Sequence, residues 1–228
     1  GMVAAGRALP PPVLTLATLV AGALAAGGSA ALNQVIDRQV DRRMARTARR
    51  PIAANRLAPA EGLAFGLGML TLSFYLMARF ANPKAAMLTL AGIIYYLWVY
   101  SLFLKKRSTL NIVIGGGAGA IPPLVGWAAV NGSLAPFALG LFVIVFLWTP
   151  PHFWSLAFVR HEEYRSAGIP MLPVVVGRTI TARRILGASV LLVLFTWAMP
   201  LLGGAGLIYE LAAVILGLLF ALLAVRLW

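Results

Sequence analysis

The stretch that decides the fold is residues 11–32, PPVLTLATLVAGALAAGGSAAL, an apolar run without a charged side chain. A helix needs about 20 mostly apolar residues to cross the hydrocarbon core of a bilayer, and this run has that length and composition. Six further runs of the same kind follow, at 59–80, 83–104, 110–130, 134–159, 182–202 and 207–228. The sequence therefore predicts an all-α, polytopic bundle of seven transmembrane helices.

Composition supports a membrane protein and excludes a soluble one. Hydrophobic residues make up 61% of the 228 residues and charged residues only 11%, which would leave a soluble domain without enough polar surface. A net charge of +13 is also found in nucleic-acid-binding proteins. Here topology explains it, because all but three of the 19 Lys and Arg lie in alternate connections or at Arg226. By the positive-inside rule those connections face the cytoplasm, and we expect no nucleic-acid partner.

The chain is predicted to form a single transmembrane domain over residues 1–228. Gly1 to Gly6 lack the charged start and cleavage pattern of a signal peptide, and Trp228 closes an apolar run without a polar tail. We therefore expect the domain to be truncated at both ends. Cysteine is absent, which excludes disulfides and thiolate metal sites.

Two long connections on the basic side, residues 38–58 and 160–181, are where we expect a functional site. The connections on the opposite side are tight hairpins. Most of the acidic side chains lie in the long connections or at their edge. Long polar loops in a protein otherwise reduced to hairpins commonly carry function. The two segments also resemble each other loosely, which suggests an internal duplication.

Asn33, Asp37 and Asp41 form the sharpest pattern in the sequence. They are spaced four apart at the end of the first span, so a continuing helix places all three on one face. Carboxylates at membrane depth are costly and mark functional sites. Oxygen ligands in a row suit Mg²⁺, which keeps room for waters and substrate phosphates. The alternative is an ion-paired helix end, since seven arginines follow between Arg38 and Arg56.

Basic residues next to this pattern predict a diphosphate site. Guanidinium groups match phosphate oxygens bidentately, and together with carboxylates and a metal they can hold a diphosphate and stabilise it as it leaves. Lys105 and Lys106 add charge on the same side. The alternatives are lipid-headgroup binding and a simple cytoplasmic anchor. The candidate phosphate contacts in the first connection are Arg46, Arg49 and Arg50.

A second polar constellation follows the fifth span, from His161 to Arg165. Its glutamates could face the first carboxylates across the cytoplasmic mouth and add metal ligands. Adjacent residues cannot share one helical face, so we expect one direct ligand, and Glu163 is favoured over Glu162. Tyr164 is a candidate substrate contact beside them.

Aromatic and small residues within the membrane are candidates for binding a large flat ligand. His152 follows two prolines that we expect to interrupt the helix, and it stands beside Trp148 and Phe153. Its imidazole could ligate iron or move a proton, or simply pack. Glycines at 115–119 either allow close helix contact or leave space for a ligand. Tyr residues at 95–100 either face a cationic intermediate or serve as packing aromatics.

At this point the residues resemble the UbiA prenyltransferase superfamily. The pattern Asn33-x-x-x-Asp37-x-x-x-Asp41-x-x-Met44-x-Arg46-Thr47-x-x-Arg50-Pro51 looks like its first aspartate-rich motif. Four further motifs match the members that farnesylate haem: Tyr100-Ser101-x-x-Leu104-Lys105, Gly119-Ala120-x-Pro122-Pro123-x-x-Gly126, Trp148-x-x-Pro151-His152-Phe153 and Tyr164-x-x-Ala167-Gly168-Ile169-Pro170-Met171-Leu172-Pro173-Val174. The match covers residues 1 to about 177.

The resemblance implies nine helices around a cavity that opens to the cytoplasm, of which seven are present here. It implies Mg²⁺-dependent transfer of farnesyl from farnesyl diphosphate to a vinyl group of haem B. Metal ligation then falls to Asp37, Asp41 and Glu163, although relatives commonly carry aspartate at the last position. The implied setting is a prokaryotic cell membrane, in contact with membrane lipids and with haem A synthase or terminal oxidase assembly factors as partners.

Two alternatives remain open at the level of the sequence. A sibling prenyltransferase acting on a quinone or chlorophyll precursor would share the aspartates and arginines but has no need of Pro151-His152-Phe153. A transporter or lipid-binding scaffold would use the charged loops for anionic headgroups. The aspartate spacing argues against this second alternative.

Overall fold

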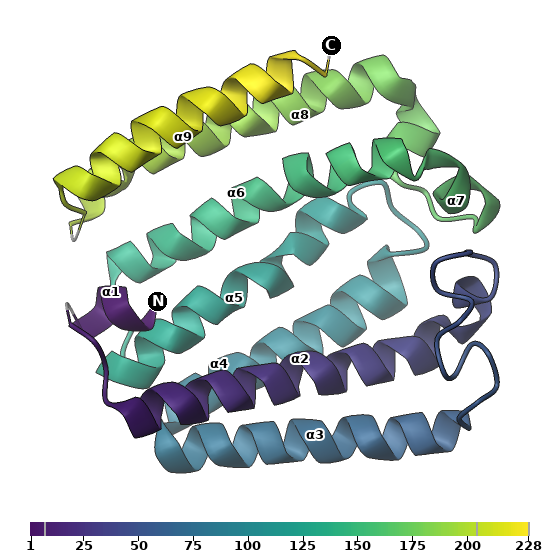
Figure 1. Ribbon diagram of the computed structural model, residues 1–228, viewed down its shortest axis with the longest axis horizontal. Coiled ribbons are helices and arrows are strands. Elements are labelled where there is room, and N and C mark those ends of the chain that lie inside the picture. Colours follow the sequence, from purple (N-terminus) through teal and green to yellow (C-terminus); the bar gives the residue numbers. More distant parts are fainter. Residues whose placement is uncertain (7, 204, 228) are drawn as a thin grey trace.

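A computed structural model describes residues 1–6, 8–203 and 205–227 of the chain. The described residues form helices and no strand (Figure 1). The helices are α1 (Met2–Gly6), α2 (Pro12–Asp41), α3 (Pro59–Phe80), α4 (Pro83–Ile94) with the π-helix η1 (Tyr95–Leu104), α5 (Asn111–Asn131), α6 (Pro136–Val159), α7 (His161–Ser166), α8 (Leu172–Ala198) with the 3₁₀ turn η2 (Met199–Leu202), and α9 (Leu207–Val225).

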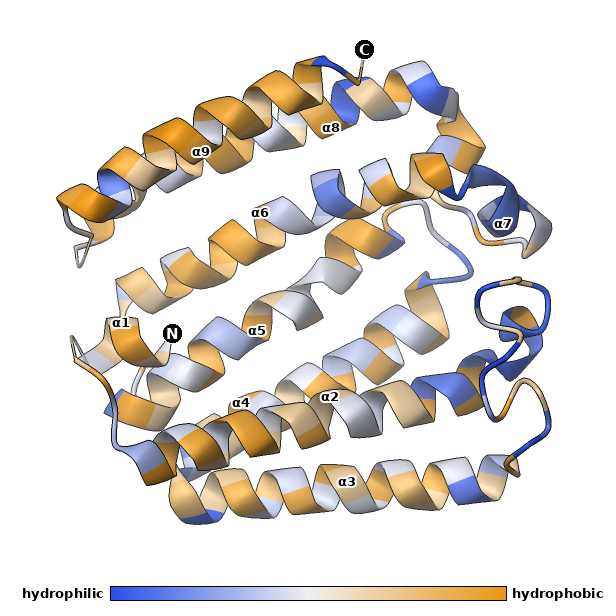
Figure 2. Cartoon of the chain, viewed as in Figure 1, coloured by the Kyte–Doolittle hydropathy of each residue, from blue (hydrophilic) through white to orange (hydrophobic). Residues whose placement is uncertain are grey.

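Seven of the helical segments are long and apolar enough to cross a membrane, as predicted, and the chain is an integral membrane protein. Large apolar side chains cover much of the outer surface of the bundle. Hydrophilic residues gather at one end, over the connection after α2 and over α7 (Figure 2). We refer to this end, with residues 42–58, 105–110 and 160–171, as the charged end.

Helix starts follow the prolines in the sequence. The helices α2, α3, α4, α6 and α8 each have proline in their first positions, where the missing N–H breaks no hydrogen bond. Asn82 caps α4, because its side-chain oxygen accepts a hydrogen bond from the Ala85 N–H at 2.9 Å. The hairpin between α3 and α4 is therefore fixed by local chemistry.

The predicted start of the sixth span was wrong. It was placed at residue 182, whereas α8 begins at Leu172, directly before Pro173. Arg178, Arg183 and Arg184 lie in the first half of α8, and their charges interrupt the apolar pattern from which the span was predicted. The helix is kinked at Gly177, whose φ of 78° favours a residue without Cβ. The second long connection is correspondingly shorter than expected.

The π-helix η1 was not predicted. Its wider turns bring the Lys105 N–H to the Tyr100 carbonyl at 2.9 Å, a bond that spans five residues. Tyr96 and Tyr100 stack in it with ring centroids 5.7 Å apart. π-helical turns are rare and frequently lie at functional sites. This one ends directly at the basic cluster of the charged end.

Small residues allow close contact between helices at Gly115, Gly116 and Gly117, which is one of the two alternatives predicted for 115–119. A Cβ added at Gly115 would lie 2.3 Å from the Tyr100 ring, and one at Gly116 would lie 2.9 Å from the Thr149 side chain. The glycines of α5 therefore admit η1 on one side and α6 on the other. Another expectation was wrong: Pro150 and Pro151 do not interrupt α6, which runs on to Val159.

Candidate active site

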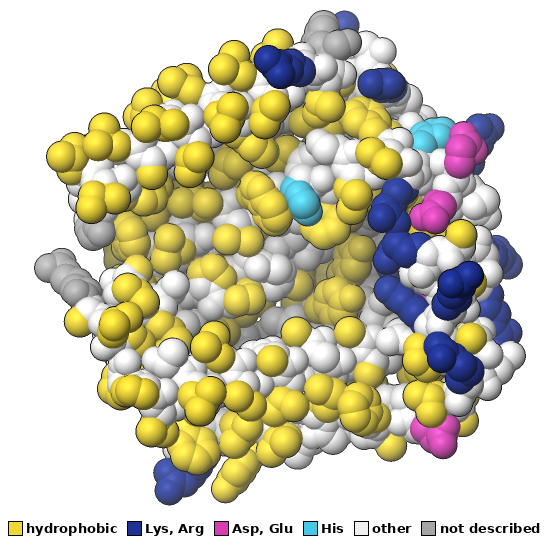
Figure 3. Space-filling model, in the orientation of Figure 1, with side chains coloured by type: hydrophobic (Ala, Val, Ile, Leu, Met, Phe, Trp, Pro, Cys, Tyr) yellow, Lys and Arg dark blue, Asp and Glu magenta, His cyan; other side chains and the backbone are white. Residues whose placement is uncertain are grey.

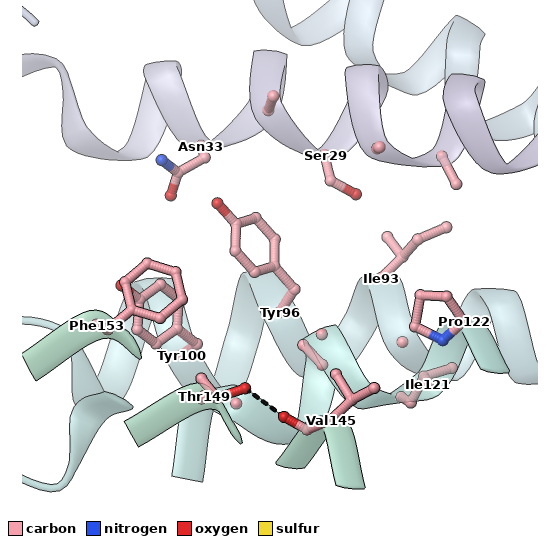
Figure 4. A pocket seen from close by; sticks show the side chains of 18 of the residues that line it. Ser29, Asn33, Ile93, Tyr96, Tyr100, Ile121, Pro122, Val145, Thr149 and Phe153 are labelled. Carbon is pink, nitrogen blue, oxygen red and sulfur yellow. Dashed lines mark hydrogen bonds between the residues drawn. The ribbon is translucent and has the colours of Figure 1, made fainter. Parts of the chain in front are cut away.

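A cavity of about 1120 Å³ lies between α2, η1, α5 and α6. It opens on the face drawn in Figure 3, where the surface is deeply hollowed. Asp41, Arg46, Arg50 and Lys105 line it at the charged end. Most of the remaining wall is apolar or aromatic, including the rings of Tyr96, Tyr100 and Phe153 (Figure 4). A polar mouth therefore leads into an apolar interior.

The predicted acidic face of α2 is present. The helix continues to Asp41, and Asn33, Asp37 and Asp41 are 6%, 0% and 3% exposed. A buried carboxylate needs a paired cation, and both aspartates have one. Lys105 donates a hydrogen bond to Asp37, and the Lys106 ammonium lies 3.2 Å from the other oxygen of the same carboxylate.

Asp41 is paired with Arg50, a residue of the following loop. The Arg50 Nη1 donates to both carboxylate oxygens, at 3.1 and 2.9 Å. Thr47 is buried beneath this pair and donates from its hydroxyl to the Asp41 carbonyl at 3.0 Å. The sequence pattern contains Thr47, but we had assigned it no role. Its position shows that it fixes the start of the loop.

The loop itself is held by Arg42 and Asn55. Arg42 donates to the Ala53 carbonyl at 3.0 Å and to the Asn55 side chain at 2.5 Å, and Asn55 has a φ of 56°. This arrangement places Arg46 and Arg50 at the cavity. Arg49 is exposed and does not line the cavity, in contrast to what we expected of a phosphate contact.

Lys105 and Lys106 likewise separate into two positions. Lys105 lines the cavity and Lys106 does not, although both approach Asp37. Asn111 is 1% exposed and donates from its side chain to the Lys105 carbonyl at 3.2 Å. Sequence reasoning missed Asn111. The sequence signal that could have identified Asn111 is a side-chain amide at the boundary between a basic cluster and an apolar span.

The second constellation is built differently. The Glu162 side chain is 81% exposed and lies 3.2 Å from His161 and 3.9 Å from Arg165. Glu163 lies 3.7 Å from Arg160. Neither glutamate lines the cavity, whereas Tyr164 does.

Within the described residues, no three His, Asp or Glu side chains are grouped closely enough to hold one metal ion. The structure therefore does not bring Glu162 or Glu163 together with the two aspartates. The oxygen donors of α2 nevertheless fit Mg²⁺ on chemical grounds. The Asn33 side-chain oxygen is buried and accepts no hydrogen bond, and it stands on one helical face with two carboxylates. Figure 4 shows Asn33 directed into the cavity, toward the Tyr96 hydroxyl.

His152 is exposed and is not part of the cavity wall. Its ring stacks on Trp148 at 4.2 Å and meets Phe153 edge-on at 5.1 Å. Both of these aromatic neighbours do line the cavity. The predicted aromatic setting of His152 is therefore present. The imidazole contacts rings that line the cavity but does not line the cavity itself.

Comparisons with known proteins agree with this geometry. The UbiA prenyltransferase family matches residues 1–228. A protoheme IX farnesyltransferase from Gloeobacter violaceus is 51% identical over 214 residues, which cover 94% of this chain and 70% of the relative. Its namesake from Roseiflexus sp. is 48% identical over 219 residues, 96% of this chain and 41% of the relative. The chain thus spans only part of the length of these relatives.

The fold also has a counterpart among solved structures. A UbiA homologue from Archaeoglobus fulgidus, bound to DMAPP and Mg²⁺, has a TM-score of 0.75 at 17% identity, over 99% of this chain and 80% of that one. The predicted bundle type is therefore confirmed at the level of the fold.

Proposed function

The chain belongs to the UbiA prenyltransferase family, and on that premise we propose that it transfers a farnesyl group from farnesyl diphosphate to a vinyl group of haem B. The products are haem O and diphosphate. One observation carries this proposal: one cavity joins a mouth lined by Asp41 and basic residues to a wide apolar interior. Its volume of about 1120 Å³ exceeds the ~300–1,000 Å³ of ordinary small-molecule pockets, which supports the binding of two substrates together.

The diphosphate binds at the charged end. Arg46, Arg50 and Lys105 line the cavity there and supply donors that match phosphate oxygens. Arg50 and Lys105 are paired with Asp41 and Asp37 in the structure. Binding of the diphosphate transfers part of their hydrogen bonding to phosphate. Lys106 and Arg49 stand outside the cavity and contribute long-range attraction.

Mg²⁺ would be held by Asn33, Asp37 and Asp41, and it would offset the charge of the diphosphate. Glu163 would join them as a further carboxylate only if α7 moved, because the structure does not bring it to the aspartates. The choice of α2 for this role is supported by the buried, unpartnered Asn33 oxygen. The two lysines and Arg50 form ion pairs with the aspartates in the structure. They also restrain the carboxylates in one orientation.

The transfer breaks the bond between C1 of the farnesyl group and the diphosphate oxygen, and the electron pair leaves with the diphosphate. The terminal vinyl carbon of haem then bonds to C1. Water adds to the cation left beside the pyrrole and loses one proton, giving a hydroxyl group. The rings of Tyr96, Tyr100 and Phe153 line the cavity in which these steps take place, and their π faces stabilise positive charge. The apolar wall limits access of water to the allylic cation.

Haem binds toward α6. Trp148 and Phe153 give the cavity flat aromatic surfaces, and Tyr164 lines it from α7. His152 supports Trp148 from outside and is the imidazole nearest to this region along α6. We assign His152 to haem binding on this basis. The basic residues of the charged end support a site that faces the cytoplasm under the positive-inside rule, and the membrane proposed for it is a prokaryotic cell membrane.

The test is mass analysis of haem after incubation with farnesyl diphosphate and Mg²⁺. Purified protein in lipid nanodiscs is given haem B, and the porphyrin is extracted and analysed. The expected result is conversion of haem B to haem O with release of diphosphate. Transfer to a quinone or chlorophyll precursor, with haem B left unchanged, would contradict the proposal and favour a sibling reaction.

A further inference from the structure

The cavity extends well beyond the charged end. On α2 its lining reaches back from Asn33 to Gly22 and Leu19. Asn33 and Gly22 are separated by about 16 Å along the helix, at ~1.5 Å per residue. On α5 the lining reaches Pro123 and Gly126. The described lining residues of this far end carry no charged side chain, and Gly1 with its amino group also lines it. The apolar side chains between Gly1 and the charged end suit an apolar chain.

The short helix α1 closes this far end. Met2 lines the cavity and lies against α5, so that a Cβ added at Gly126 would approach the Met2 side chain to 3.2 Å. The Asn131 side chain donates a hydrogen bond to the Ala5 carbonyl at 3.2 Å, which ties α1 to the end of α5. The position of Met2 is therefore set by a hydrogen bond and by the close approach that Gly126 allows.

Two glycines in the wall are not explained by helix packing. A Cβ added at Gly22 or at Gly119 would meet no atom within 4 Å, although both residues line the cavity. This differs from Gly115, where the Tyr100 ring fills the space beside the backbone. The space beside Gly22 and Gly119 is open and continuous with the cavity. Their missing side chains leave room for a ligand between the charged end and α1.

We infer that α1 limits the length of the isoprenoid chain that the cavity accepts, and that the end of this chain contacts Met2. The inference rests on the proposed function, because it requires a prenyl diphosphate anchored at Arg46 and Arg50. The tail then runs along α2 past Gly22 toward α1. A longer tail collides with Met2, and a side chain at Gly22 shortens the available path. Methionine is unbranched and adaptable, so it can pack closely against the last isoprene unit.

Competition between donors of different length tests this arrangement. Protein in nanodiscs is given haem B with equimolar geranyl, farnesyl and geranylgeranyl diphosphates, and the prenylated haems are separated by mass. Met2→Ala should raise the ratio of geranylgeranyl to farnesyl product by about tenfold, since small changes in an apolar pocket are worth ~10- to 200-fold in discrimination. Gly22→Leu should raise the ratio of geranyl to farnesyl product.

Matched controls use residues outside the cavity. Val3→Ala removes an exposed side chain from the same helix as Met2, and Gly68→Leu adds a side chain on α3 where nothing lies within 4 Å. Both controls should keep the wild-type product ratios. If wild type makes haem O but Met2→Ala and Gly22→Leu leave the ratios unchanged, the tail leaves sideways toward lipid and the inference is overturned. If wild type transfers no prenyl group to haem, the proposed function fails, and the inference fails with it.

Discussion

The end of α2 with the connection that follows it, and the segment after α6, resemble each other loosely in sequence but differ in structure. In both, acidic residues are followed by a basic run. At the end of α2, the carboxylates of Asp37 and Asp41 are buried and each is paired with a cation. After α6, Glu162 is largely exposed and Glu163 lies beside Arg160, and neither lines the cavity. Composition alone therefore does not identify the stronger half of a site.

The difference has a simple physical origin. Asp37 and Asp41 lie four residues apart in α2, so the helix itself fixes the direction of both side chains. The glutamates lie in α7, a helix of only six residues without a buried side chain. A helix of this length gains little stability on its own. The first connection is thus pre-organised for binding, while the second requires a movement to contribute.

The largest expected effect comes from the buried aspartates. Asp37→Asn and Asp41→Asn should each reduce turnover by at least about a hundredfold, the size expected when one preorganised electrostatic group is lost. The amide keeps the volume of the side chain but removes the charge. Turnover is measured at saturating Mg²⁺, with the melting temperature of each variant followed separately.

Glu61→Gln is the matched control, because Glu61 is an exposed carboxylate at the start of α3. It should retain wild-type turnover. Near-normal turnover in both aspartate variants would remove the metal assignment from α2 and leave the ion-paired helix end as the better explanation.

Arginine variants should have the next largest effect. Arg46→Ala and Arg50→Ala should each weaken binding of farnesyl diphosphate by about tenfold to a hundredfold, from ~1.5–3 kcal/mol per charged hydrogen bond. Affinity for haem should change little. Arg49→Ala is the control, because Arg49 is exposed outside the cavity. Equal losses for both substrates would indicate a structural role for the loop.

The sequence predicted the helices well and the site in part. The long apolar runs predicted the number of spans and most of their boundaries. The spacing of Asn33, Asp37 and Asp41 predicted their common face. The sequence could not predict η1, because π-helical turns depend on tertiary contacts such as that between Tyr100 and Gly115.

Two residues whose side chains donate hydrogen bonds to backbone carbonyl groups were also not predicted. Asn111 and Thr47 hold carbonyl groups of the two segments that carry Lys105 and Asp41. Their side chains have no distinctive spacing, and only the folded loops bring them to those carbonyls. The exposure of Arg49 depends in the same way on a loop held by Arg42 and Asn55.

A smaller effect is expected for the second connection. Glu163→Gln should lower apparent Mg²⁺ affinity by about tenfold, the lower limit seen when groups supporting a metal site are changed. Glu162→Gln should change it little, because Glu162 is largely exposed. Activity titrated with Mg²⁺ measures both. A loss at Glu163 as large as that at Asp37 would show that α7 closes onto α2 during the reaction.

The smallest effect on turnover is expected at His152, where the readout is spectral. His152 stacks on Trp148 and lies outside the cavity wall, so haem reaches it only if the aromatic pair rearranges on binding. If His152 ligates the iron, His152→Ala shifts the visible spectrum of bound haem and weakens haem binding, while affinity for farnesyl diphosphate is unchanged. If it only packs against Trp148, the variant lowers the melting temperature and leaves the spectrum intact. His161→Ala is the companion variant, because His161 is the chain's other imidazole and stands beside Glu162. A spectral shift in His161→Ala without one in His152→Ala would move the iron from α6 to the second connection and make that connection, rather than α6, the haem-binding region.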